Sequence, residues 1–358
     1  MNKNVYFHIS DALLYWYASN KRDLPWRETT DPYRIWISEI ILQQTRVNQG
    51  YDYYLRFIER FPSVNVLAEA SEDEVLRLWQ GLGYYSRARN LHKAAKQIVS
   101  NFNAVFPSNY SDILNLPGIG EYTAAAISSS AYNQPYAVVD GNVYRVLSRL
   151  FGIATPINSS KGKKEFSALA QELIDKQHPS TYNQAIMDFG ALQCTPSSPK
   201  CKDCPMQNFC FAYETKQQDK FPVKENKTKV SNRYFNYLFV VNNSNTYLKK
   251  RSEKDIWAGL YEFPLIETNK ILSGKELLEN KEFQKLFAKS TVELQNFSTS
   301  IKHKLSHRLI EAQFISIQIE SESALLKEYL RVPLNRLHEY PTSRLITLFL
   351  EQQDKKQS

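Results

Sequence analysis

The sequence predicts two domains, an all-helical domain followed by an α+β domain, on three observations. From about residue 8 to residue 192, apolar residues recur at helical spacing, which predicts about ten helices. From residue 233 onward, segments rich in aromatic and β-branched residues predict strands. Between them lie the four cysteines of the chain. At 358 residues, the chain is long enough to form two hydrophobic cores.

An acidic residue lies inside the apolar helical run of residues 33–42. Glu39 shares a helix face with Ile35, four positions before it. A carboxylate among apolar groups loses hydration, which raises its pKa and lets it keep a proton near neutral pH for donation to a leaving group. An ion pair with a nearby arginine, such as Arg34 or Arg46, is the alternative explanation.

Two segments carry residues suited to a disrupted nucleic-acid duplex. Gln44 and Thr45 have side chains that can hydrogen-bond the edge of an unpaired base. Residues 81–89 combine a glycine-containing turn, two arginines and bulky side chains, so Leu82 or Tyr84 could fill the gap that an extruded nucleotide leaves. Packing of Leu82 and Tyr84 in the core is the alternative.

A tight turn with two glycines, Gly118 and Gly120, precedes the predicted helix at residues 121–127. Such a turn exposes backbone N–H groups at a helix N-terminus, where they can bind a phosphate without a charged side chain. An ordinary turn between two helices has the same pattern, so the turn alone does not decide between these explanations.

Asp140 precedes a run of apolar residues at helical spacing, Val143, Val146 and Leu147. This pattern predicts that Asp140 is the N-cap of a helix, and capping alone explains an aspartate there. A capping aspartate stays ionised, which also suits a group that stabilises positive charge.

The cysteine spacing, C-x6-C-x2-C-x5-C, predicts one metal centre in a loop at residues 194–210 that ends a helical domain of residues 1–211. Four-cysteine zinc sites usually use two separated C-x2-C pairs, so a single such pair with wider flanking gaps favours an iron–sulfur cluster over zinc. A disulfide pair is a more distant alternative. The expected ligands are Cys194, Cys201, Cys204 and Cys210.

The segment at residues 212–232 is rich in charge and poor in large apolar residues, which predicts an exposed linker. The following domain, residues 233–350, is expected to be α+β. Its predicted elements are strands at 234–241 and 312–319 and helices near 275–288 and 342–352.

The formal net charge of +8 and the pI of about 9.0 favour a polyanionic partner, although many proteins with such a balance bind none. The N-terminus lacks the pattern of a signal peptide, and no run of about 18 apolar residues occurs. We therefore expect a soluble, cytoplasmic and nucleoid-associated protein without a membrane partner. Thiolate ligands agree with a reducing compartment.

Together these features resemble the helix-hairpin-helix DNA glycosylases with a 4Fe-4S cluster, and within them the MutY-type adenine DNA glycosylases. The resemblance covers nearly the whole chain and implies one 4Fe-4S cluster per chain. Besides the cysteine spacing, its motifs are LPWR at 24–27, SEIILQQT at 38–45, GLGYYSRARN at 81–90, LPGIGEYTAAAI at 116–127, VDGNVYRVLSR at 139–149, NQAIMDFGALQC at 183–194 and GLYEFP at 259–264.

The family resemblance implies that adenine opposite 8-oxoguanine or guanine is flipped out of double-stranded DNA and that its N-glycosidic bond is hydrolysed, leaving an abasic site. It implies that Glu39 protonates adenine N7 and that Asp140 stabilises the positive charge on the sugar. Tyr122 and Asn142 would hold the sugar and the acid in place. Residues that match positions around the adenine pocket are Arg22, Trp26, Arg27 and Gln184.

Position 122 separates two subfamilies of similar enzymes. Relatives that resemble endonuclease III carry a lysine there, and its amine forms the Schiff base that leads to strand cleavage. Tyr122 has no amine, so the resemblance implies a monofunctional glycosylase. An endonuclease III-like glycosylase and lyase is one alternative, and a noncatalytic 4Fe-4S protein that binds damaged DNA is another.

The C-terminal domain resembles the Nudix fold but lacks the acidic Mg²⁺ ligands of Nudix hydrolases after GLYEFP. In the family this domain recognises 8-oxoguanine, and the resemblance implies that Ser306 and His307 make this contact here. Leu305 replaces the usual phenylalanine, and Tyr261 stands where tryptophan is common, so we expect a preserved but weaker preference for 8-oxoguanine. We also expect a monomer that can bind repair or replication-clamp partners.

Overall fold

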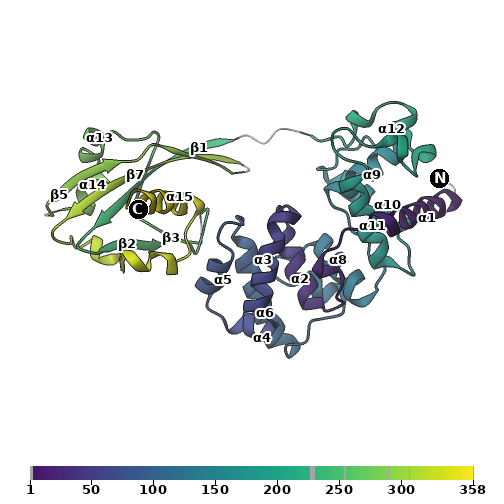
Figure 1. Cartoon of the computed structure of the whole chain (residues 1–358), viewed down its shortest axis with the longest axis horizontal. Helices are drawn as coiled ribbons and strands as arrows, with labels where there is room; N and C mark the ends of the chain where they lie inside the picture. Colours follow the sequence, from purple (N-terminus) through teal and green to yellow (C-terminus); the bar gives the residue numbers. More distant parts are fainter. Residues whose placement is uncertain (1–2, 226–229, 254, 289, 306, 358) are drawn as a thin grey trace. The chain divides into compact units, whose positions relative to one another are not determined.

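The structure is a computed structural model that describes residues 3–225, 230–253, 255–288, 290–305 and 307–357. It divides into two compact units (Figure 1). The first unit holds the described residues up to 69 and from 90 to 225, and the second holds residues 70–89 and the described residues from 230 onward. The first is helical and the second is built mainly on β-sheets, which confirms the predicted fold classes.

The N-terminal part of the chain is helical throughout, and over residues 3–192 it forms eleven α-helices and one 3-10 helix. Most of these belong to the first unit. The α-helices are α1 Lys3–Asn20, α2 Pro32–Leu42, α3 Val47–Arg60, α4 Val64–Glu69, α5 Glu72–Leu78, α6 Ser86–Phe102, α7 Tyr110–Leu114, α8 Glu121–Tyr132, α9 Gly141–Phe151, α10 Ser160–Leu173 and α11 Pro179–Leu192, and the 3-10 helix is η1 Pro25–Arg27.

Helix starts in the first unit follow local sequence signals. The Asp31 carboxylate accepts a hydrogen bond from the Tyr33 backbone N–H at 2.9 Å at the start of α2, and the Ser159 hydroxyl accepts one from Gly162 N–H at 2.9 Å at the start of α10. Helices α2 and α11 each place a proline in the first turn, where a missing N–H costs no hydrogen bond.

The core of the first unit is built around α11, which packs against α1, α8 and α9. Its fully buried members include Leu13, Leu147, Phe166, Tyr182 and Phe189. Burial of this many large apolar side chains is the main stabilising contribution to the unit. It also fixes where α8 and α9 begin relative to α11, and these helix starts form the candidate site below.

The segment predicted as a linker at 212–232 contacts the first unit over its first part. It contains most of α12 Phe211–Glu214 and the 3-10 helix η4 Gln218–Lys220, and Phe221 is buried. The Ile157 N–H donates to the Val223 carbonyl at 3.0 Å, and Asn158 exchanges two hydrogen bonds with the Glu225 backbone. The buried phenylalanine explains why a segment of high charge still packs against the helices.

The second unit contains a five-stranded sheet and a three-stranded sheet. Strands β1 and β7 pair in parallel, with Tyr237 opposite Phe314, and the sheet order is β4-β1-β7-β5 with β6 also paired to β7. The smaller sheet has the order β3-β2-β8. The strands are β1 Ser231–Val241, β2 Asn245–Lys250, β3 Tyr261–Glu262, β4 Leu265–Thr268, β5 Val292–Phe297, β6 Ile301–Lys304, β7 Arg308–Ile319 and β8 Leu330–Pro333.

Both faces of the larger sheet are covered (Figure 1). Leu238 and Ile315 face a core formed with α13 Gly274–Leu278 and α14 Lys281–Leu286. Tyr237 and Phe314 lie on the opposite face, where Phe314 stacks on Phe349 of α15 Arg344–Gln357 with ring centroids 4.3 Å apart. This two-sided burial explains the nearly continuous run of large apolar residues in β1 from Tyr234 to Val241.

Residues 70–89 form the remaining part of the second unit. Helix α5 is capped by the Ser71 hydroxyl, which accepts from the Glu74 N–H at 3.2 Å, and the first turn of α6 ends the segment. Among the helices of the described residues, none is both long enough and apolar enough to cross a membrane.

Candidate active site and cysteine cluster

Glu39 lies on α2 with its side chain facing the interior, and the residue is 8% exposed. The pKa of its carboxyl is raised to about 7, chiefly by burial and also by the charge of Asp140, although a hydrogen bond with Tyr122 and the charge of Arg27 act in the opposite direction. Arg34, the predicted alternative partner, instead lies 3.6 Å from Asp31. Glu39 is therefore a carboxyl that can hold a proton near neutral pH.

Tyr122 lies on α8 and joins this carboxyl to the core. Its hydroxyl takes part in a hydrogen bond with Glu39 and also lies 3.3 Å from the Met187 sulfur. Burial raises the pKa of Tyr122 well above its ordinary value, and the charges of Glu39 and Asp140 add to this rise. The phenol thus stays neutral and can donate a hydrogen bond when Glu39 is ionised or accept one when Glu39 is protonated.

Asp140 is the N-cap of α9, as the sequence predicted. Its carboxylate accepts hydrogen bonds from the backbone N–H groups of Asn142 and Val143 and from the Asn142 amide, each at 2.8 Å. Burial raises the pKa of Asp140 above its ordinary value, and these three hydrogen bonds work in the opposite direction. Because they favour the ionised form, Asp140 is better suited than Glu39 to carry a negative charge.

A hydrogen-bonded connection runs from Asp140 to the cysteine loop. Asn142 accepts from the Arg145 guanidinium at 2.8 Å, and Arg145 also donates to the carbonyls of Gly190 at 2.6 Å and Cys194 at 2.7 Å. Helix α11 approaches α9 closely here, because a Cβ at position 190 would lie 2.6 Å from the Asn142 Cβ. Helix α9 therefore begins at the capping carboxylate of Asp140 and contacts the cysteine loop through Arg145, farther along the same helix.

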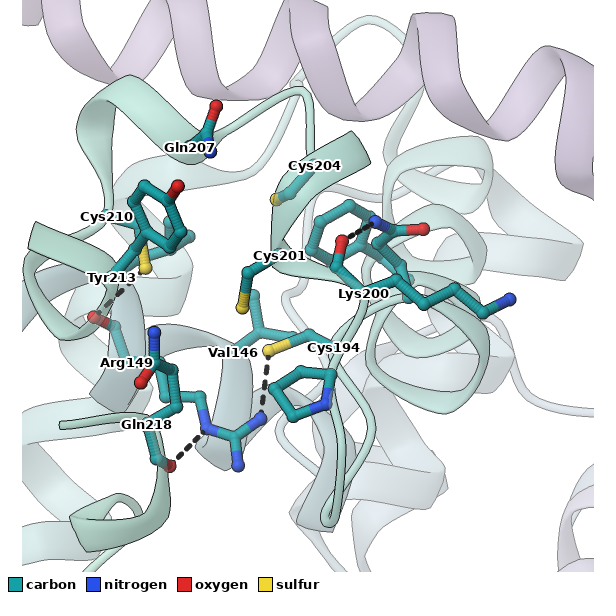
Figure 2. A pocket seen from close by; sticks show the side chains of 14 residues that line it. Val146, Arg149, Cys194, Lys200, Cys201, Cys204, Gln207, Cys210, Tyr213 and Gln218 are labelled. Carbon is teal, nitrogen blue, oxygen red and sulfur yellow. Dashed lines mark hydrogen bonds between the residues drawn. The ribbon is translucent and has the colours of Figure 1, made fainter. Parts of the chain in front are cut away.

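The four cysteines, all partly buried, line one cavity together with Arg149 (Figure 2). The Arg149 guanidinium lies 3.4 Å from the Cys194 sulfur and donates to the Thr195 carbonyl at 2.8 Å. Burial, together with the charges of the neighbouring cysteines, raises the pKa of the Cys204 thiol to about 12. Four thiolates therefore need a compensating positive charge in this cavity.

Two arginines expected around the base pocket converge on an aspartate that the sequence analysis missed. The side chain of Asp188 on α11 is fully buried and accepts from Arg22 Nε at 2.9 Å and from Arg27 at 2.7 and 2.8 Å. These hydrogen bonds outweigh burial, so the pKa of Asp188 lies below its ordinary value. The signal was available in the sequence, since Asp188 is an acidic residue within an apolar helix, as Glu39 is.

The other residues expected at the base pocket, Trp26 and Gln184, lie on η1 and α11. Trp26 is buried in η1 and packs edge-on against Tyr54 with ring centroids 5.2 Å apart. Gln184 is half-buried on α11, one helical turn before Asp188 and therefore on the same face.

The predicted glycine turn joins α7 to α8. Gly118 has a φ of +79°, and a Cβ there would lie 2.7 Å from the Asn90 Cβ, so position 118 requires glycine. Gly120 is the N-cap of α8 and leaves the first N–H groups of that helix without a side-chain cap. This is the geometry expected of a phosphate-binding turn.

The remaining duplex-contact candidates differ in exposure. Leu82 is 7% exposed, in agreement with core packing, whereas Tyr84 is 51% exposed and has a φ of +48°. Tyr84 is thus the better candidate to enter a duplex. Gln44 is exposed with a φ of +56°, and Thr45 is half-buried with its hydroxyl donating to the Gln43 carbonyl at 3.3 Å.

The expected 8-oxoguanine loop lies between β6 and β7. His307 is exposed, and its carbonyl accepts from the Ser231 N–H at 3.1 Å. Leu305 is half-buried and packs against the core next to α15. Ser306 lies outside the described residues.

Comparisons with known proteins match two parts of the chain to protein families. Residues 37–176 match the HhH-GPD superfamily of base excision DNA repair proteins, and residues 236–352 match the NUDIX domain. The adenine DNA glycosylase of Buchnera aphidicola subsp. Schizaphis graminum is 38% identical over 76% of this chain and 78% of its own length. That of Mus musculus is 43% identical over 58% of this chain and 42% of its own length.

Solved structures agree on the helical fold. A thermostable thymine-DNA glycosylase has a TM-score of 0.55 and 31% identity, covering 60% of this chain and 97% of its own. A non-covalent endonuclease III–DNA complex has a TM-score of 0.53 and 21% identity, covering 61% of this chain and 99% of its own, and supports the fold alone.

We predict that Asp188→Asn lowers the free energy of unfolding by about 3 kcal/mol at pH 7, because it leaves two arginines without their carboxylate. The folded-state pKa of Asp188 is below its unfolded value, so its stabilisation is present above pH of about 4 and is lost as the pH falls. Denaturant unfolding at pH 7 and pH 3 measures both effects. Asp23→Asn, at an exposed position nearby, should change little. Equal stability of wild type and the Asp188→Asn variant at pH 7 would contradict the prediction.

Proposed function

This chain belongs to the adenine DNA glycosylase family of the HhH-GPD superfamily, and from that premise we propose how it acts and on which mispairs. We infer that it hydrolyses the N-glycosidic bond of adenine opposite 8-oxoguanine or guanine in double-stranded DNA and leaves an abasic site. The observation that carries the catalytic assignment is the buried Glu39 carboxyl, whose pKa is raised to about 7 and which is close enough to Asp140 to be influenced by its charge. The Asp140 carboxylate itself accepts hydrogen bonds.

In the proposed reaction, Glu39 transfers its proton to N7 of the flipped adenine. The bond between the sugar C1′ and adenine N9 then breaks, and its electron pair leaves with the now neutral base. The sugar retains positive charge, which the Asp140 carboxylate stabilises, and a water adds to C1′ and loses a proton. Burial supports the first role and three hydrogen bonds support the second, so the two carboxyls begin in opposite protonation states.

Tyr122 supports a purely hydrolytic reaction. Strand cleavage through a Schiff base needs an amine beside the sugar, and the residue at this position is a neutral phenol. We propose that Tyr122 and Asn142 are positioning residues, since one hydrogen-bonds Glu39 and the other hydrogen-bonds Asp140.

The pocket for the base is proposed to include Arg22, Trp26, Arg27 and Gln184. The fixed pairing of both arginines with Asp188 supports this assignment, because a pocket whose donors are already oriented loses less entropy on binding. Gly118 and Gly120 are proposed to bind the DNA backbone through N–H groups at the start of α8.

For the opposite base, we propose that Ser306 and His307 hydrogen-bond 8-oxoguanine. The exposure of His307 supports its part in this contact. Leu305 packs against the core and offers no aromatic face to the lesion, which supports a weaker preference for 8-oxoguanine over guanine.

We also propose that the four cysteines hold one 4Fe-4S cluster. The four thiols converge on one cavity beside the Arg149 guanidinium, and their spacing has a single C-x2-C pair with wider flanking gaps, which supports a cluster over zinc. When bound, the cluster would supply positive charge to the thiolates and cross-link the 194–210 loop. This loop also contains Lys200 and Lys202, which are exposed and can contact DNA phosphates.

The catalytic proposal predicts adenine release in single-turnover assays from duplexes with adenine opposite 8-oxoguanine or guanine, and little release opposite thymine. Strands should break only after alkali, because the enzyme leaves an abasic site intact. Glu39→Gln should slow release about 100-fold or more, since the amide cannot donate the proton. Alkali-independent breakage at the rate of release would favour a lyase, and binding without release would favour a noncatalytic protein.

The same proposal predicts how the rate depends on pH. Glu39 acts only when protonated, so the rate should fall as the pH rises through about 7 and approach a tenfold loss per pH unit above pH 8. A single-turnover profile from pH 5.5 to pH 9 on adenine opposite 8-oxoguanine measures this. The residual activity of the Glu39→Gln variant should lack the decline, and a flat wild-type profile would refute the assignment of Glu39.

The cluster proposal predicts about four iron and four sulfide ions per chain. Cys201→Ser should reduce both contents and lower the thermal unfolding midpoint and DNA affinity, because the loop loses a cross-link. Ser197→Ala, in the same loop, is the matched control and should change none of these. About one zinc ion per chain without sulfide would reject the cluster.

A further inference from the structure

Residues 70–89, here called the wedge segment, contact the C-terminal sheets and helix of their own unit at three places. At the first place, the Asp73 carboxylate lies 2.6 Å from the Lys250 ammonium and accepts a hydrogen bond from the Tyr261 hydroxyl at 2.9 Å. Lys250 and Tyr261 are paired residues of β2 and β3, so the smaller sheet presents both groups side by side to one carboxylate. A tryptophan at position 261 would lack this hydroxyl.

The second place links the end of α5 to α15 and the residues before it. The Gln80 amide donates to the Thr347 hydroxyl at 2.9 Å. The buried Tyr85 hydroxyl donates to the Thr342 carbonyl at 3.4 Å and accepts from the Gly81 N–H at 3.3 Å. These contacts lie on both sides of the turn that carries Tyr84.

The third place is a close approach of backbone to helix. Gly259 has a φ of +81°, and a Cβ there would lie 3.2 Å from the Glu72 carboxyl oxygen and 3.3 Å from Leu76. Arg89 donates to the Ala258 carbonyl. The turn before β3 therefore lies close against the wedge segment, at a position whose positive φ favours glycine.

Within the wedge segment, the exposed Tyr84 is held in a small turn. Trp79 Nε1 donates to the Gly83 carbonyl at 3.2 Å, and the Arg87 guanidinium donates to the same carbonyl at 3.2 Å. Arg87 also lies over the rings of Trp79 and Tyr84, 5.2 and 5.7 Å from their centroids. The turn is thus held by hydrogen bonds from Trp79 and Arg87 within the wedge segment, and the residues on either side of it contact the C-terminal part of the unit.

We propose that the C-terminal domain positions the wedge segment, so that recognition of the base opposite adenine and insertion of Tyr84 into the duplex are coupled. Asp73 and Gln80 are the positioning residues of this coupling. The inference rests on the proposed function, because it takes the C-terminal domain as the part that recognises the opposite base. Binding energy gained at that base then favours insertion only through contacts that join the two segments.

The consequence is specific to the lesion. With 8-oxoguanine opposite adenine, the C-terminal domain gains binding energy that can favour insertion of Tyr84 through the connecting contacts. With guanine it gains less binding energy, so loss of the connecting contacts has a smaller effect on the rate of adenine release. A merely structural role for Asp73 would slow adenine release equally from both duplexes.

The first measurement is the ratio of single-turnover rates for adenine opposite 8-oxoguanine and opposite guanine. Asp73→Asn should lower this ratio about fivefold, mainly through the 8-oxoguanine duplex. Adding Lys250→Met to Asp73→Asn should produce little further loss, because both changes break the 2.6 Å contact between Asp73 and Lys250, and the other ion pair of Lys250, with Glu72, is longer at 3.9 Å. Gln80→Met tests the second contact and should lower the ratio in the same direction.

Two reference variants calibrate the result. Ser306→Ala with His307→Ala sets the ratio reached when recognition itself is lost. Glu351→Gln breaks an exposed ion pair of similar length, 2.7 Å from Arg344 within α15, and should leave the ratio unchanged. An equal loss on both duplexes, additive effects of Asp73→Asn and Lys250→Met, or an unchanged ratio would overturn the coupling.

A second measurement separates this inference from the proposed function. We expect 2-aminopurine beside an uncleavable adenine analogue to become more fluorescent when Tyr84 enters the duplex and unstacks the neighbouring bases, with Tyr84→Ala as the background. At saturating protein, Asp73→Asn should reduce the increase about threefold or more with 8-oxoguanine opposite. A wild-type rate ratio near one would contradict the proposed preference alone, whereas an undiminished increase in the Asp73→Asn variant would contradict the coupling alone.

Discussion

The close packing of α9 against α11 is the constraint on which the first unit depends. Glycine at position 190 lets the two helices approach until Asn142 lies against the α11 backbone. On either side of this contact, α9 begins after the capping carboxylate of Asp140, and α11 ends at Leu192, two residues before Cys194. Arg145 holds the contact by donating to both helices' ends. The geometry of the carboxylate and that of the cysteine loop therefore rest on the same pair of helices.

Burial has different consequences for the acidic residues of this unit because their partners differ. Glu39 has one hydrogen bond from a phenol, so burial dominates and its pKa rises to about 7. Asp140 has three hydrogen bonds that offset much of the same effect. Asp188 faces two guanidinium groups, and its pKa falls despite complete burial of its side chain. One physical rule, the balance of lost hydration against local donors, thus yields a candidate acid, a candidate anion and a structural ion pair.

The second unit shows that sequence order and structural grouping differ. Residues 70–89 lie among the helices in sequence, but Asp73 contacts β2 and β3, Gln80 contacts α15, and Tyr85 contacts the residues before α15. Each contact is modest, since exposed ion pairs and single hydrogen bonds contribute little to stability. Their importance lies in where they act, on both flanks of the turn that exposes Tyr84.

The sequence by itself determined the two fold classes, the cap at Asp140, the grouping of four cysteines and the unusual setting of Glu39. These features depend on periodicity, helix capping and local spacing, which neighbouring residues encode. Only the tertiary structure decided that Asp188 pairs with Arg22 and Arg27, that Leu82 is buried while Tyr84 is exposed, and that the wedge segment joins the C-terminal sheets. Partners more than 150 residues apart meet through packing of whole helices and sheets, and no local pattern records which side chains that packing brings together.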